Sequence, residues 1–175
     1  SHKVRIPRRV IELVAIKSGT YEIKEGAPLK ETLSLFASGK EFHFSLTFVE
    51  GSRFEDWLKQ LSSAPYLERL TVEQSETELA QELGIDNGKL EGWFLPETYA
   101  YTTHASDISI LRRAYQDMKT FLQENWEKRQ ANLPYKTPYE ALIMASIIEK
   151  ETGQPDERAQ IASVFVNRLR LGMKL

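Results

Sequence analysis

The sequence of 175 residues predicts an α+β fold, in which a small β/α module is followed by a helix-rich region. Two patterns of apolar residues support this prediction. Every second residue from Phe42 to Phe48 is apolar, which is typical of a half-buried strand. From Ile108 to Trp126, apolar residues recur at steps of three or four, which indicates an amphipathic helix. Hydrophobic residues make up 41% of the chain, enough for a core in one domain or two small ones.

The first forty residues predict two strands and a helix. Residues 10–17 and 20–24 have strand character, and Ser18 and Gly19 form a turn between them. A helix is expected to begin at Pro28 and to end at Gly39, because proline favours the first turn of a helix and glycine its end. Its expected apolar face consists of Leu29, Leu33 and Phe36.

A second strand-to-helix junction follows at Glu50 and Gly51. The expected helix has apolar residues at Phe54, Leu58 and Leu61 and is broken by Pro65. A shorter helix should then begin after Ser75, which forms a capping box with Glu78, and end at Gly84.

Residues 90–101, with the sequence LEGWFLPETYAY, combine aromatic rings with two acids. Aromatic faces stack on sugar rings and carboxylates bind hydroxyl groups, so the segment could line a sugar-binding cleft. Its candidate substrate-binding residues are Glu91, Glu97 and Tyr99. The alternative, which the sequence leaves open, is a core loop in which Trp93 and Phe94 serve only for packing.

Three further helices are expected in the second half of the chain. The amphipathic helix is capped at Ser106 and Asp107, and a nearly continuous apolar helix runs from residue 137 or 138 to Glu151 before Gly153. Its apolar residues cover most of its circumference, so it should be buried on nearly all sides. The last helix extends from Pro155 to Arg170, with its inward positions at Ile161, Val164, Phe165 and Leu169.

The apolar helix ends in two acids, Glu149 and Glu151, which point about 200° apart on a helix and cannot face one cleft. Glu149 lies on the same stripe as Ala145 and Ser146, which leave room beside it. Partial burial and the helix C-terminus should both raise the pKa of a carboxyl placed there, as suits a general acid. The alternative is a solvated helix end, or an ion pair with Lys150 or Arg158. Asn167, on the last helix, could orient the catalytic carboxyl or serve for packing.

Composition argues against several classes of function. The net charge of −2 offers no basic surface for nucleic acid, and the chain has no cysteine. The three histidines lie far apart, outside any metal-binding spacing, so neither a metal nor a cofactor is expected. No apolar run is long enough to span a bilayer. Acid–base chemistry on carboxylates remains, and polysaccharides are the substrates that require it.

Residues 90–99 (LEGWFLPETY), 145–152 (ASIIEKET) and 162–169 (ASVFVNRL), in this order, resemble the endolytic murein transglycosylase family, the MltG or YceG-like proteins. The turn at residues 18–21 and the Glu50–Gly51 junction are also similar, so the resemblance covers nearly the whole chain. It implies a LysM-like peptidoglycan-binding module in residues 1–50. Residues 51–175 would form a catalytic domain that is truncated at its C-terminus, because the family continues with an Asp-Pro-Thr segment.

The resemblance also implies an activity and a location. Glu149 would be the catalytic residue of a lytic transglycosylase, a lyase that cleaves nascent peptidoglycan glycan strands and leaves 1,6-anhydroMurNAc ends. The protein would face the periplasm from the bacterial inner membrane, with its membrane anchor upstream and cell-wall synthases as partners. Two alternatives remain: a two-carboxylate glycoside hydrolase that pairs Glu149 with Glu91 or Glu97, and a non-catalytic peptidoglycan-binding scaffold.

Overall fold

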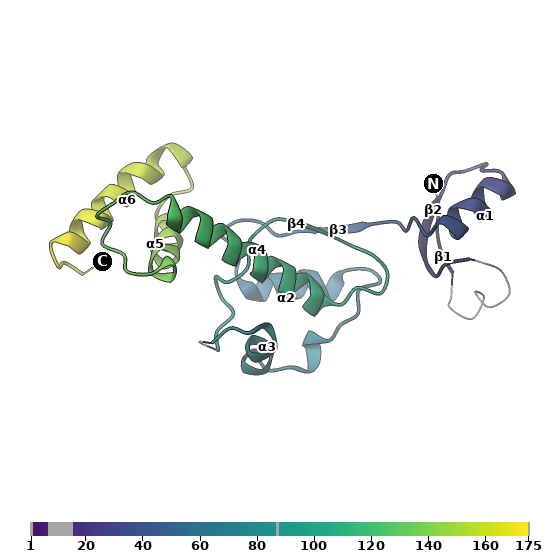
Figure 1. Cartoon of the computed structure of the whole chain (residues 1–175), viewed down its shortest axis with the longest axis horizontal. Coiled ribbons are helices and arrows are strands. Elements are labelled where there is room, and N and C mark those ends of the chain that lie inside the picture. The colour runs from purple at the N-terminus through teal and green to yellow at the C-terminus, as the bar shows by residue number, and fades with distance from the viewer. Residues whose placement is uncertain (1, 7–15, 87, 175) are drawn as a thin grey trace.

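A computed structural model describes residues 2–6, 16–86 and 88–174 as an elongated molecule (Figure 1). Its elements, in chain order, are β1 (His2–Ile6), β2 (Gly19–Ile23), α1 (Leu29–Ser38), β3 (Phe44–Thr47), α2 (Phe54–Ser63), the 3₁₀ turn η2 (Thr71–Glu73), α3 (Glu76–Leu83), β4 (Thr98–Tyr101), α4 (Asp107–Glu127), α5 (Pro138–Glu151) and α6 (Pro155–Arg170). The β1, β2 and α1 elements lie at one end, α5 and α6 lie at the other, and the remaining elements lie between them (Figure 1). The predicted α+β class is confirmed.

The N-terminal end consists of an antiparallel pair, β1 and β2, covered by α1. Leu35 and Phe36 of α1 pack against Ile16 and the fully buried Tyr21. The predicted helix is confirmed, and Gly39 ends it with a φ of 72°, which glycine adopts without strain. The expected face is confirmed only at Phe36, because Leu29 is 74% and Leu33 43% exposed. Leu35, which was not expected on this face, packs beside Phe36.

The partner of β2 differs from the expected one. The prediction placed a strand at residues 10–17, of which residues 10–15 lie outside the described residues, and Ile16 and Lys17 are not part of a strand. The observed partner is β1, with Val4 opposite Tyr21. In β1 the apolar residues Val4 and Ile6 alternate with the charged Lys3 and Arg5 over only four positions, so its strand signal is weak. The LysM-like character and the boundary at residue 50 stay predictions.

The main hydrophobic core lies between the antiparallel pair β3 and β4 and helices α2, α3 and α4. The expected strand at Phe42–Phe48 is confirmed as β3, and Phe44 and Phe48 are buried. Phe48 stacks on Trp57 of α2 with ring centroids 3.8 Å apart. The helix breaks and caps that the sequence indicated at Gly84 and Ser106 are present. This core holds the turn between β3 and α2 in place.

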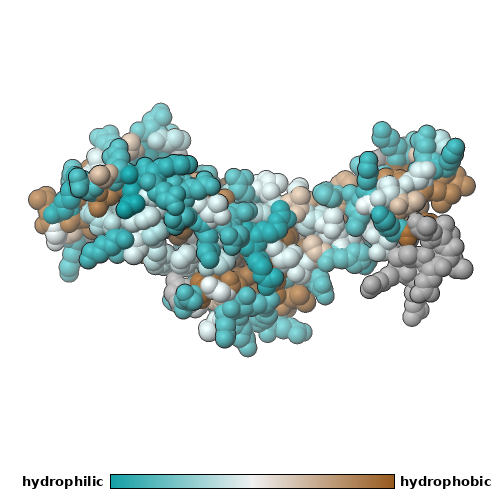
Figure 2. All heavy atoms as spheres, viewed as in Figure 1, coloured by the Kyte–Doolittle hydropathy of each residue, from teal (hydrophilic) through white to brown (hydrophobic). Residues whose placement is uncertain are grey.

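Helices α5 and α6 have the predicted bounds but not the predicted burial. Met144 is the one residue of α5 that is buried, and α6 has none among the described residues. Of the expected inward residues of α6, Val164 is 52% exposed, whereas Ile161, Phe165 and Leu169 are half-buried. The expectation of a helix buried on nearly all sides is therefore wrong, because α4 and α6 are the helices that pack against α5. Figure 2 shows apolar side chains at the surface of this end, where Leu171 and Met173 are exposed.

Candidate functional site

Glu149 lies in the last turn of α5, where its carboxylate faces the first turns of α6. Its Oε2 is 2.9 Å from Nη2 of Arg158, and the two side chains are 33% and 38% exposed, respectively. The short Thr152–Gln154 connection brings the helices together, because Thr152 Oγ1 donates to Glu157 and accepts from the Gln154 amide. As the alternative to a general acid, the sequence left open a solvated helix end or an ion pair with Lys150 or Arg158. The structure shows the ion pair with Arg158.

The turn between β3 and α2 reaches the same position from a distant part of the sequence. Gly51 has a φ of +71°, and a Cβ at this position would lie 3.8 Å from the Glu149 side chain. The neighbouring Lys150 donates to the Gly51 carbonyl at 3.4 Å. The Glu50–Gly51 junction and the end of α5, two of the features that suggested the family, therefore meet in space. Glu151 is exposed on another face of α5.

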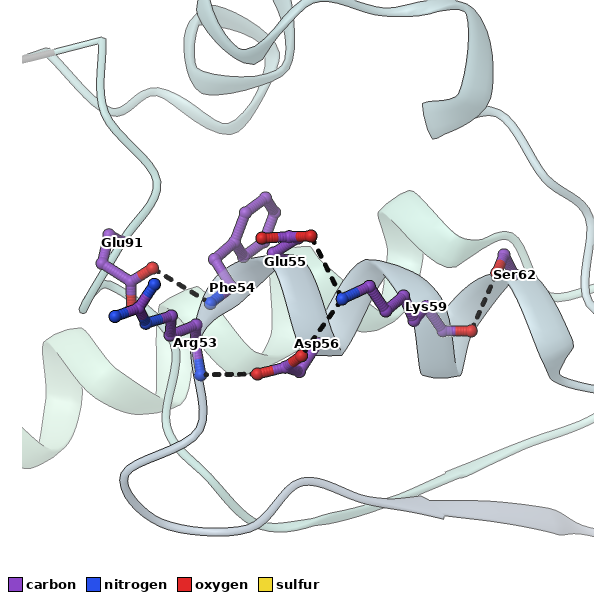
Figure 3. A network of polar contacts seen from close by, with 7 residues as sticks. All are labelled: Arg53, Phe54, Glu55, Asp56, Lys59, Ser62 and Glu91. Carbon is purple, nitrogen blue, oxygen red and sulfur yellow. Dashed lines mark hydrogen bonds and ion pairs between the residues drawn. The ribbon is translucent and has the colours of Figure 1, made fainter.

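Glu91 contacts the start of the helix that follows this turn. Its Oε2 accepts a hydrogen bond from the amide of Phe54, the first residue of α2, at 3.1 Å (Figure 3). Asp56 accepts from the Arg53 amide at the same helix end. A carboxylate at a helix N-terminus satisfies an amide that has no partner within the helix. The residues between Gly51 and Phe54 thus connect Glu149 with Glu91.

This contact predicts a stability role for Glu91. Replacing Glu91 with Ala should lower the free energy of unfolding by about 0.5–1 kcal/mol, because the Phe54 amide loses its acceptor. Glu91→Gln keeps an acceptor oxygen and should cost less. Urea denaturation followed by circular dichroism compares the two variants. Equal losses would indicate that the charge, and not the hydrogen bond, supports the start of α2.

Tyr99 lies on β4, and Glu97 is the residue directly before this strand. The ring of Tyr99 is 2% exposed, and its hydroxyl donates to the Leu95 carbonyl at 2.7 Å. Burial raises the pKa of Tyr99, and the charges of Asp117 and Glu97 add to this effect. In this structure Tyr99 packs in the core, and Glu97 is exposed beside it. Their predicted roles in substrate binding stay predictions.

The other aromatic residues of this segment divide between core and surface. Phe94 is buried and stacks on Phe54, with ring centroids 5.0 Å apart. Trp93 is partly buried and stacks on Tyr139 of α5 at 4.9 Å, with the rings nearly parallel. Residues 90–97 therefore pack as a loop that joins the main core to α5, and residues 98–101 form β4. The packing of Trp93 and Phe94 agrees with the core-loop alternative.

Asn167 lies in the last turns of α6 and is exposed. It falls nine positions, more than two turns, after Arg158, the residue of α6 that contacts Glu149. The contact on α6 is made by Arg158, which the sequence identified only as an alternative ion-pair partner. Its position shortly after the Gly153 helix break was the available signal. The predicted role of Asn167 is untested.

The described residues contain no group of three or more His, Asp or Glu residues arranged to hold a metal ion. None of the helices found in residues 2–6, 16–86 and 88–174 combines the length and apolar character needed to cross a membrane.

Comparison with known proteins connects these features with a family. The sequence model of the YceG-like family matches residues 3–175. An endolytic murein transglycosylase of Bacillus subtilis is 25% identical over 91% of the chain, which corresponds to 49% of its own length. An endolytic murein transglycosylase of Streptococcus pneumoniae is also 25% identical, with 34% of its length covered. The chain thus spans at most about half the length of these relatives.

Proposed function

This chain belongs to the YceG-like family, and from that membership we propose that it carries the glutamate of an endolytic peptidoglycan lytic transglycosylase. The proposed substrate is the β-1,4 bond between MurNAc and GlcNAc in nascent glycan strands. The observation that best supports the proposal is the meeting of Glu149, Arg158 and the Gly51 turn, which come from separate parts of the sequence. Two relatives bear the name endolytic murein transglycosylase.

In the proposed reaction Glu149 serves first as acid and then as base. The protonated carboxyl gives its proton to the glycosidic oxygen as the bond from C1 of MurNAc to that oxygen breaks. The resulting carboxylate then takes the proton of the C6 hydroxyl of the same sugar while the C1–O6 bond forms. Atoms balance without water, and the glutamate ends protonated. Because the nucleophile belongs to the substrate, its attack is effectively unimolecular and needs no second carboxylate.

The structure also bears on the hydrolase alternative. A hydrolase needs a second carboxylate roughly 5–9.5 Å from the acid, to attack the sugar or activate water. Glu91 is the candidate beside the same turn, but its carboxylate accepts the Phe54 amide. Glu97 is exposed at the start of β4. Because the Glu91 carboxylate is bound to the start of α2, it is less suited to serve as the second carboxylate of a hydrolase. This supports the transglycosylase proposal.

The product distinguishes the two reactions. We expect the full-length protein to release fragments from purified murein with 1,6-anhydroMurNAc ends, about one water lighter than reducing ends. Mass spectrometry of digests made in heavy-oxygen water measures both features. Reducing ends that carry the heavy oxygen would instead establish the hydrolase. Binding to murein without any new ends would establish the scaffold.

The location of the protein is a separate proposal. We propose that it faces the periplasm from the bacterial inner membrane, with its anchor preceding the present chain, and that cell-wall synthases are its partners. The support for this location is that the chain belongs to the YceG-like family, which the sequence motifs had suggested. Fractionation of cells that produce the full-length protein, with protease added to spheroplasts, tests it. Protection from the protease in intact spheroplasts would contradict a periplasmic orientation.

A further inference from the structure

Arg158 contacts the Glu149 carboxylate through one edge of its guanidinium. The Nη2 atom lies 2.9 Å from Oε2 of Glu149. The Nε atom, on the same edge, is buried and has no hydrogen-bond partner among the described residues. An arginine edge normally offers two parallel N–H groups to a carboxylate. Here one of them is used and the other remains available at the same contact.

The position of Arg158 is fixed by the local fold. Pro155 starts α6 directly after the α5 connection, and Thr152 bonds to Glu157, the residue before Arg158. The guanidinium is thus delivered from a different helix to the end of α5. A cation on a second helix restricts the orientation of the Glu149 carboxylate more than a cation on the same helix end would, because both helices then hold the ion pair.

The other charged groups near this carboxylate make different contacts. On α5, Lys150 donates to the Gly51 carbonyl, and Glu151 is exposed on another face. On α6, Glu157 accepts from Thr152. Beside Gly51, the side chains of Glu50 and Arg53 are exposed. Arg158 is therefore the charged group that the described structure places in direct contact with Glu149.

We propose that Arg158 is the positioning residue of Glu149: its ion pair orients the carboxylate beside the Gly51 turn. The role of this ion pair in catalysis rests on the proposed function of Glu149. After product release the same ion pair restores the orientation of the carboxylate for the next cleavage.

The first test measures the carboxyl itself and needs no activity. In the 175-residue chain labelled with carbon-13 at glutamate side-chain carboxyls, the Glu149 signal is identified by its loss in Glu149→Gln. At one fixed pH its chemical shift should change in Arg158→Gln, because the carboxylate loses the guanidinium that donates to it. Arg158→Lys keeps the charge and should stay closer to the unmodified chain.

The matched control is Arg112→Gln. Arg112 forms an ion pair with Glu82 away from the site, at 3.4 Å, so this variant removes an equivalent charge without touching Glu149. Its Glu149 carboxyl signal should not move. An unchanged Glu149 signal in Arg158→Gln, or an equal change in Arg112→Gln, would overturn the proposed role of Arg158.

The second test uses murein cleavage by the full-length protein. Arg158→Gln should lower kcat about tenfold with a smaller change in KM, because a misplaced carboxyl transfers its proton more slowly, while Arg158→Lys should recover part of the rate. A higher KM with an unchanged kcat would contradict the inference. If the unmodified protein cleaves no murein, the proposed function fails, whereas the Glu149 carboxyl signal still decides whether Arg158 orients Glu149.

Discussion

Glu149→Gln is expected to lower murein cleavage by the full-length protein about 10²–10⁴-fold, the usual contribution of a general acid or base. Glutamine keeps the shape of the side chain but has no proton to transfer. The loss should appear in kcat as well as in kcat/KM, because the proton moves only as the glycosidic bond breaks. Rates of anhydro-end formation, measured by mass spectrometry, provide the readout.

The fold should tolerate this change. The ion pair with Arg158 is about one-third exposed, and pairs of this kind contribute about 1 kcal/mol or less. The melting temperature of Glu149→Gln should therefore remain close to that of the unmodified protein. The matched control is Glu151→Gln, which removes the same charge from an exposed position two residues later. If Glu151→Gln abolishes cleavage and Glu149→Gln does not, the assignment of the catalytic glutamate is wrong.

Local sequence signals predicted the ends of the elements well. Pro138 and Gly153 gave the bounds of the helix that carries Glu149, and the Ser75–Glu78 capping box gave the start of α3. These signals work because a cap or a helix break depends on a few neighbouring residues. The strand β4 lacked such a signal. It is four residues long in an aromatic segment, and its pairing with β3 joins residues about fifty positions apart.

Burial and long-range contacts were less accessible from the sequence. The apolar composition of α5 indicates which faces can be buried, but the partner of each face comes from other elements. In the described residues α4 and α6 pack on α5, and Ile143 remains 44% exposed. In the candidate site, the helix-face argument separated Glu149 from Glu151. The sequence did not predict that Gly51 would lie beside Glu149, since the two are nearly one hundred residues apart.

Asp107 lies at the start of α4 and also binds a distant segment of the chain, a contact that only the fold reveals. The sequence identified it only as part of the cap of α4. In the structure it is 1% exposed, and its carboxylate accepts hydrogen bonds from the amides of Leu70, Thr71 and Ile108 and from the Thr71 hydroxyl. The chain between α2 and α3 is thus fastened to the start of α4. Thr71 and Leu70 lie 36 and 37 residues from Asp107 in the sequence, whereas Ile108 is the next residue.

Asp107→Ala is therefore expected to lower the free energy of unfolding by about 3 kcal/mol, because it leaves one buried and three partly buried donors without this acceptor. This is a large part of the stability of a small domain. Thr71→Val, the control, removes one hydroxyl donor from the same carboxylate and should cost only about 1 kcal/mol. Urea denaturation followed by circular dichroism measures both variants. A loss below that of Thr71→Val would show that the Asp107 carboxylate does not fasten these segments together.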